Sequence, residues 1–204
     1  MRPKAYIFDF DGTLVHSNKI KRDAFYDLSD QIIKNKQVVD EVLSSIPEVS
    51  RFEIIEKIHE IIANNSGLTF DREVIQKAID KYSEVVREKV LACPEVNGAS
   101  ELLTTLNAEG NLIFISSNTP EEPLGELITA RKWNKVIKGY YGFPKQKPET
   151  IQAILKDRQL KSSEVLVIGD GSSDETSALQ TGCHFFKIKN ENSLRELYLL
   201  LYNQ

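Results

Sequence analysis

Two aspartates with a single residue between them, Asp9 and Asp11, follow an apolar segment near the start of the chain, in the stretch YIFDFDGTL. The apolar residues predict a buried strand, so Asp9 is expected at its carboxyl end and Asp11 where the chain turns at Gly12. Two carboxylates at such a point can hold a hard cation through oxygen, and one of them can also attack an electrophile. An ordinary turn would account for Asp11 and Gly12, but it would not account for Asp9 at the end of an apolar strand.

A second polar cluster, Ser116–Asn118, follows the apolar run Leu112–Ile115. Hydroxyl and amide donors at a strand end can hold the oxygens of a phosphoryl group. Taken alone, this short segment is better explained by a simple turn. The pair Lys147–Pro148 precedes a helical pattern, and a lone lysine is more typical of a solvated charge than of a catalytic group.

A third polar cluster, GDGSSD at Gly169–Asp174, follows the apolar run VLVI. Asp170 and Asp174 add carboxylates that could complete a magnesium site. The alternative is a loop that leads into a capped helix, because Ser172 and Glu175 have capping-box spacing. The residues alone leave both interpretations open.

Composition argues against several classes of partner. The chain has 204 residues with Lys+Arg 26 and Asp+Glu 30, and a net charge of −4 gives no basic field for nucleic acid or an anionic membrane. No apolar run approaches the roughly 20 residues of a membrane span, and KAYIFDF begins too early to leave room for a signal peptide. Cys93 and Cys183 fit neither a disulfide framework nor a zinc spacing. We therefore expect a soluble cytoplasmic protein, a monomer or homodimer, with no nucleic-acid or membrane partner.

The elements that must position these residues alternate between strand and helix in the second half of the chain. Short apolar runs fit strands covered on both faces, and the stretches between them have helical periodicity, which indicates a parallel sheet wrapped by helices. The expected strands are Ala5–Phe10, Leu112–Ile115, Val136–Tyr140, Val165–Ile168 and Cys183–Ile188.

Between Leu14 and Pro94 the apolar residues recur at helical spacing throughout, which predicts a helical insert. They include Ile20, Ala24, Phe25, Leu28 and Ile32, then Phe52, Ile55, Ile58 and Ile62, then Ile75, Ile79, Tyr82 and Val86. The segment SRFE at Ser50–Glu53 matches a capping box, so a helix should start there with Arg51 in its first turn. An insert directly after the first strand lies where a doubly wound sheet holds its ligands, which favours a lid over a site. A helical bundle added for bulk or dimerisation is the alternative.

Taken in chain order, these segments resemble the motifs of the haloacid dehalogenase superfamily. DFDGT is similar to its first motif, SN to its second, KP to its third and GDGSSD to its fourth, and the resemblance covers nearly the whole chain. It implies an α/β fold, a Rossmann-like three-layer α/β/α core with a parallel sheet of strand order 5-4-1-2-3 and an inserted helical cap of the C1 type. The implied bounds are 1–14 and 94–204 for the core and 15–93 for the cap. Among C1-cap members the chain resembles phosphoglycolate phosphatases and beta-phosphoglucomutases.

The resemblance also implies roles for individual residues. Asp9 would be the nucleophile that takes the phosphoryl group, and Asp11 would be the general acid/base that protonates the leaving oxygen and then activates water. Lys147 would neutralise negative charge on the nucleophile and the phosphate. Members of the family that cleave carbon–halogen bonds do not keep an aspartate at the position of Asp11, so phosphoryl transfer is favoured.

Binding residues follow from the same resemblance. Ser117 would bond to the transferring phosphoryl group with Asn118 beside it, and Arg51 is a candidate for holding a distant part of the substrate. The implied Mg²⁺ ligands are the Asp9 carboxylate, the Asp11 backbone carbonyl, Asp170 and, through water or Lys147, Asp174. A solvated first-turn arginine is an equally good account of Arg51.

The expected function is therefore a magnesium-dependent phosphatase that acts on a small phosphorylated metabolite. A phosphomutase of the same family would share all the motifs and differ in how well the cap excludes water. A regulatory or binding protein that keeps the fold without the activity is a third possibility, and the intact Asp9 and Asp11 argue against it.

Overall fold

Two separately packed units make up the chain in the computed structural model, which describes residues 2–28, 35–46, 49–67, 69 and 71–202. The core unit comprises Met1–His16 and Cys93–Gln204, and the helical unit comprises Ser17–Ala92.

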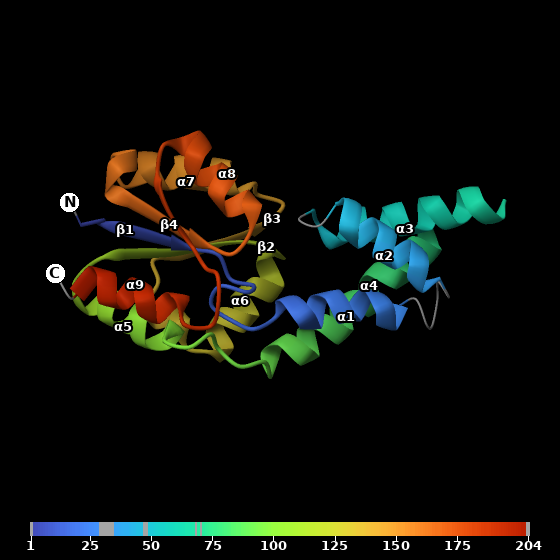
Figure 1. The fold of residues 1–204 in the computed structure, drawn as a ribbon, viewed down its shortest axis with the longest axis horizontal. Coiled ribbons are helices and arrows are strands. Elements are labelled where there is room, and N and C mark those ends of the chain that lie inside the picture. The colour runs from blue at the N-terminus through green and yellow to red at the C-terminus, as the bar shows by residue number, and fades with distance from the viewer. Residues whose placement is uncertain (1, 29–34, 47–48, 68, 70, 203–204) are drawn as a thin grey trace. The chain divides into compact units, whose positions relative to one another are not determined.

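A parallel sheet in the order β3-β2-β1-β4-β5 forms the centre of the core unit (Figure 1). Its strands are β1 (Ala5–Phe8), β2 (Leu112–Pro120), β3 (Gly139–Phe143), β4 (Val165–Gly169) and β5 (His184–Lys187). This order is the predicted one read from the opposite edge, so the predicted fold class is confirmed.

Helices cover both faces of this sheet, with α7 and α8 on one face and α5, α6 and α9 on the other (Figure 1). Their bounds are α5 (Ala99–Ala108), α6 (Glu121–Ala130), α7 (Lys147–Asp157), α8 (Ser172–Thr181) and α9 (Ser193–Tyr202), and short 3-10 turns occur at η2 (Trp133–Lys135) and η3 (Ser162–Glu164). All residues of β1 are at most 1% exposed, because a strand with helices over both of its faces can bury every side chain.

The second strand is longer than the sequence predicts. β2 continues past Ile115 to Pro120, and its pairing with β3 shifts between Ser116 and Pro120. The polar segment Ser116–Asn118 therefore lies inside the irregular end of β2 instead of after it. The apolar pattern missed this extension because polar side chains interrupt it.

The third strand begins at Gly139, three residues later than the expected Val136. The reason is the 3-10 turn η2, in which the Trp133 carbonyl accepts hydrogen bonds from the amides of Val136 at 2.9 Å and Ile137 at 3.1 Å. Those amides are then no longer available for a ladder with β2.

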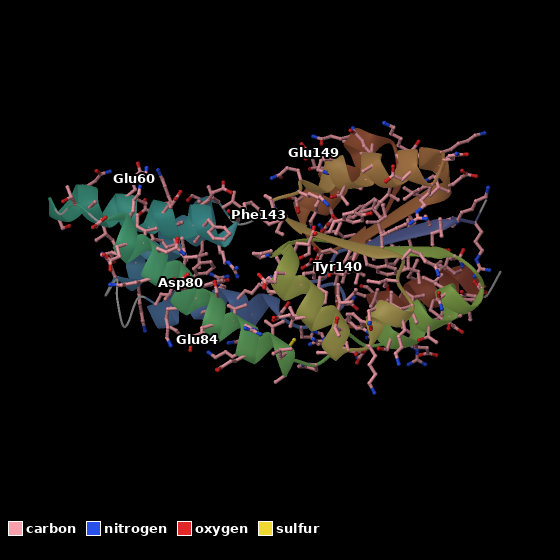
Figure 2. All side chains as sticks on the ribbon, turned by 180° about the vertical axis from the view of Figure 1, so that it is seen from behind. Glu60, Asp80, Glu84, Tyr140, Phe143 and Glu149 are labelled. Atoms are coloured by element: carbon pink, nitrogen blue, oxygen red, sulfur yellow. The ribbon has the colours of Figure 1, made fainter. Side chains whose placement is uncertain are left out.

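Amphipathic helices make up the helical unit, as predicted. They are α1 (Asn18–Leu28), α2 (Lys36–Ser45), α3 (Arg51–Ser66) and α4 (Arg72–Leu91). The rings of Phe25 and Tyr82 pack with centroids 4.4 Å apart, joining α1 to α4. The acidic side chains of Glu60, Asp80 and Glu84 are exposed on the outside of the unit (Figure 2).

Within the helical unit, the sequence indicated the start of α3 but not the helix α2. The predicted helix start is confirmed, because Ser50 is the N-cap of α3 and its Oγ accepts from the Glu53 amide at 3.4 Å. The Glu53 carboxylate accepts from the Ser50 hydroxyl at 2.8 Å instead of from the Ser50 amide that a full capping box would use. The helix α2 was not singled out by the apolar pattern, and Ile32, which was, lies outside the described residues. No helix in the described part of the chain is both long and apolar enough to cross a membrane.

Candidate active site

Three strand ends meet at one edge of the sheet and bring the polar clusters together. β1 lies between β2 and β4, and Phe8 pairs with Ile115 on one side and with Ile168 on the other. The Asp9 amide still donates to the Ile168 carbonyl at 2.8 Å, after which two later amides bond to the Phe10 carbonyl and the chain turns. β1 therefore ends two residues earlier than expected, with Asp9 directly beyond it.

Lys147 occupies the centre of this edge as the first residue of α7. Its Nζ donates to Asp9 Oδ1 at 2.9 Å and to Asp174 Oδ1 at 2.7 Å, and all three residues are buried, with exposures of 7%, 6% and 2% for Lys147, Asp9 and Asp174. A buried charge is tolerated when it is paired and hydrogen-bonded. Lys147 is thus a structural partner of both carboxylates, and the interpretation as a lone solvated lysine is wrong.

Burial dominates the electrostatics of this cluster. It raises the pKa of Asp9 to about 7; the Lys147 ammonium acts against that rise, and the carboxylates of Asp174 and Asp11 add to it. Burial also raises the pKa of Asp174, again opposed by Lys147. Burial alone would lower the pKa of Lys147, but the two carboxylates outweigh it and the pKa is raised. The lysine is therefore charged at neutral pH, and the pKa values of Asp9 and Asp174 beside it stay above their ordinary range in spite of that charge.

Three carboxylates form a cluster that could hold a metal ion: oxygens of Asp9, Asp170 and Asp174 lie within 4.8 Å of one another. Asp174 can approach because Gly169 has no side chain, and a Cβ there would lie 2.2 Å from the Asp174 Cγ. Thr13 Oγ1 lies 3.4 Å from Asp170 Oδ1. A ligand set made only of oxygen suits Mg²⁺ and does not suit zinc.

The loop before α8 shows how Asp174 is oriented. The Gly171 amide donates to Asp174 Oδ2 at 3.2 Å, and Lys187 Nζ from β5 donates to the Gly171 carbonyl at 3.0 Å. The cluster does lead into a capped helix, as the alternative expected, but the cap lies one residue earlier: α8 begins at Ser172 with Gly171 as its N-cap, and Asp174 takes the place expected for Glu175. Asp174 therefore both caps the helix and belongs to the carboxylate cluster.

Asp11 faces the end of β2. Its Oδ2 accepts hydrogen bonds from Thr119 Oγ1 at 2.7 Å and from Ser117 Oγ at 3.1 Å. The Thr119 amide in turn donates to Ser117 Oγ at 3.0 Å. Ser117 thus lies beside Asp11, and the following residue of β2, Asn118, is exposed. The end of β2 therefore supplies two hydroxyl donors to the Asp11 carboxylate, which also lies close enough to Asp9 to add to the rise of its pKa.

Arg51 lies in the helical unit, at the start of α3. Its guanidinium carbon is 5.3 Å from the centre of the Phe52 ring and 5.9 Å from that of Tyr82, within range of cation–π attraction. Its Nε is buried and has no hydrogen-bond acceptor among the described residues. Burial lowers the pKa of the guanidinium. Arg51 is thus a half-buried first-turn arginine that packs on two aromatic rings.

Residues that contact the site but were not predicted are Thr13, Thr119 and Lys187. Thr13 directly follows DFDG, and Thr119 stands two positions after Ser117, so strand alternation would have placed both hydroxyls of β2 on one face. Lys187 had no comparable signal, because its contact is with a backbone carbonyl.

Comparison with known sequences identifies the family of this chain. A family model described as haloacid dehalogenase-like hydrolase matches residues 6–188. The chain belongs to this family. It is similar to the phosphoglycolate phosphatase of Rhodospirillum rubrum, at 25% identity over 88% of this chain and 77% of that protein. The phosphoglycolate phosphatase of Vibrio parahaemolyticus is 23% identical over 90% of this chain and 82% of its own. The predicted family and enzyme class, a hydrolase of the phosphatase type, are confirmed.

Solved structures share the fold. A HAD-superfamily hydrolase of subfamily IA from Geobacter sulfurreducens has a TM-score of 0.66 at 18% identity and covers 98% of this chain and 96% of its own. The magnesium-bound protein YfnB of Bacillus subtilis has a TM-score of 0.73 at 18% identity, over 98% and 99% of the two chains.

Proposed function

We propose that this enzyme is a magnesium-dependent phosphatase that hydrolyses a small phosphorylated metabolite through a covalent phosphoryl group on Asp9. The observation that carries the proposal is the buried Asp9 at the end of β1, paired with Lys147 at 2.9 Å and close to two further carboxylates. A desolvated nucleophile held by an ammonium is suited to attack a phosphoryl group, since Lys147 favours its ionised form.

Two aspartates divide the proposed chemistry. In the first step an Asp9 oxygen bonds to phosphorus while the ester P–O bond breaks, and Asp11 gives its proton to the leaving oxygen. In the second step Asp11, now a carboxylate, takes a proton from water, whose oxygen bonds to phosphorus. The Asp9–phosphorus bond then breaks, which releases inorganic phosphate and restores both side chains.

Other residues would bind the reacting group. The Ser117 hydroxyl and the Asn118 amide at the end of β2 are proposed to donate to phosphoryl oxygens. The Asp9, Asp170 and Asp174 carboxylates, with the Asp11 backbone carbonyl, would hold Mg²⁺, which when bound supplies positive charge toward the phosphoryl oxygens. The all-oxygen cluster within 4.8 Å supports this assignment.

Phosphoglycolate is the leading candidate substrate. The two relatives with that activity in their names support a small ester that carries a second anionic group. We propose that the helical unit acts as a cap and that Arg51 holds this group. Its buried Nε, with no acceptor among the described residues, and its two aromatic neighbours favour a role in binding a carboxylate.

A substrate panel tests the proposal. Phosphate release would be measured for phosphoglycolate, sugar phosphates, nucleotides and para-nitrophenyl phosphate, each with and without magnesium, and with Asp9→Asn as the control. Release that requires both magnesium and Asp9, fastest with phosphoglycolate, is expected. A folded, magnesium-loaded wild type that releases phosphate from none of these esters would contradict the proposed function.

A further inference from the structure

Two hydroxyl groups of β2 hold the same oxygen of Asp11. Thr119 Oγ1 donates to Asp11 Oδ2 at 2.7 Å, and Ser117 Oγ donates to it at 3.1 Å. Two hydroxyl donors on one carboxylate oxygen fix the orientation of the Asp11 side chain. The two hydroxyls therefore set the position from which Asp11 can act.

The two donors are not equivalent once a substrate binds. A serine has a single O–H, which cannot donate to Asp11 and to a phosphoryl oxygen at the same time. In the proposed function Ser117 turns to the phosphoryl group. Its hydrogen bond to Asp11 is then lost, and Thr119 is the donor that stays.

Thr119 is well fixed for that purpose. Its side chain is buried, at 6% exposure, and its amide donates to Ser117 Oγ at 3.0 Å. The Thr119 carbonyl lies against β3 so closely that a Cβ at Gly142 would be 2.5 Å from it. Thr119 stands in the part of β2 where the pairing with β3 shifts, between Ser116 and Pro120. A β-branched side chain on a confined backbone has few alternative rotamers.

We infer that Thr119 is a positioning residue that holds Asp11 for proton transfer while Ser117 binds the phosphoryl group. The inference rests on the proposed acid/base role of Asp11 and adds a residue that the motifs do not include. If it is correct, removing the Thr119 hydroxyl should reduce turnover of the same esters as removing the Asp11 carboxyl, but by a smaller factor.

The test compares two esters with different needs for proton transfer. Phosphoglycolate loses an alkoxide, which requires a proton, whereas para-nitrophenyl phosphate loses a phenolate that leaves without one. Thr119→Val keeps the branched shape and removes the donor. We expect its kcat/KM for phosphoglycolate, which reports the steps up to loss of the leaving group, to fall about 10- to 100-fold, the range for a hydrogen bond to a charged group, with little change in kcat/KM for the aryl ester. Thr119→Ser, which keeps the hydroxyl, should behave like the wild type.

The Asp11→Asn variant distinguishes a failure of the Thr119 positioning role from a failure of the Asp11 acid/base role. In an Asp11→Asn background, Thr119→Val should cause no further loss, because both changes remove the same function. Equal losses for the two esters, or independent losses in the double variant, would overturn the inference while leaving the role of Asp11 intact. An Asp11→Asn variant that itself shows no preference between the esters would overturn both. Should Thr119→Val fail to fold, Thr119→Ala removes the same donor and carries the comparison.

Discussion

The core unit and the helical unit bury different kinds of side chain. Among the described residues, the buried charged groups Asp9, Asp174 and Lys147 all belong to the core unit. In the helical unit the buried side chains are mostly apolar, such as Ile55 and Ile58 of α3, and acidic groups lie on the outside (Figure 2).

The difference indicates which unit carries the chemistry. Burying carboxylates and an ammonium costs free energy that apolar residues of similar volume would not cost, so such clusters are commonest at functional sites. An amphipathic helix needs only an apolar stripe, which many sequences supply. The buried charges therefore support the proposal that bond breaking takes place in the core unit. Each prediction below tests the proposal that the helical unit contributes to substrate binding alone.

The largest effect is expected from the core residue Asp9. Asp9→Asn keeps the shape of the side chain and removes the nucleophile, so turnover of every ester should be abolished while the fold persists. Phosphate release and circular dichroism would be measured together. Appreciable magnesium-dependent turnover by the folded variant would show that bond breaking does not depend on this carboxylate.

Metal removal should have a comparable effect and should again act through the core. Thorough chelation with EDTA is expected to abolish activity, and magnesium is expected to restore it. Magnesium should also raise the melting temperature of the wild type. That rise should be lost in Asp170→Asn and retained in Asp80→Asn, which changes an exposed aspartate of the helical unit. Activity that survives chelation would remove the metal from the account.

A change in the helical unit should alter binding of one substrate class. Arg51→Met is expected to raise the KM for phosphoglycolate about tenfold or more, as loss of a charge-assisted hydrogen bond would. The kinetics with para-nitrophenyl phosphate, which has no second anionic group, should be unchanged. Arg51→Lys keeps the positive charge but lacks the planar guanidinium, so its KM for phosphoglycolate should lie between those of the wild type and Arg51→Met. An equal fall of kcat for both esters would place Arg51 in the chemistry instead.

The smallest effect is expected from the cap of α3. Ser50→Ala removes the group that accepts from the Glu53 amide, so the free energy of unfolding should fall by ~1 kcal/mol. Urea titration would measure it, with Ser83→Ala inside α4 as the control that removes a hydroxyl without uncapping a helix. The kcat for para-nitrophenyl phosphate should not change. A large loss of that kcat would contradict the division of roles.

The sequence predicted the parts of this site that depend on strand ends. Asp9, Ser117 and Asp170 each follow an apolar run, and parallel neighbours bring such ends together. Thr119 was missed because β2 was expected to end at Ile115; once the strand is known to continue to Pro120, alternation places Thr119 on the same face as Ser117. The start of β3 was misplaced because the amides of Val136 and Ile137 donate to the Trp133 carbonyl in a 3-10 turn and are not available for strand pairing. The pattern of apolar residues does not indicate which of these two hydrogen-bonding arrangements the chain adopts.

The central claim is that Asp9 carries the phosphoryl group, and trapping that group tests it most directly. With para-nitrophenyl phosphate, whose leaving group needs no proton, Asp11→Asn should slow the second step more than the first, since no base then activates water, so the acyl phosphate should accumulate during turnover. Acid quenching followed by borohydride reduction converts an aspartyl phosphate to homoserine, which peptide mass spectrometry locates. The account predicts homoserine at position 9 in Asp11→Asn, dependent on substrate, and none in the Asp9→Asn/Asp11→Asn double variant. Substrate-dependent labelling at another residue, with position 9 unmodified, would contradict it.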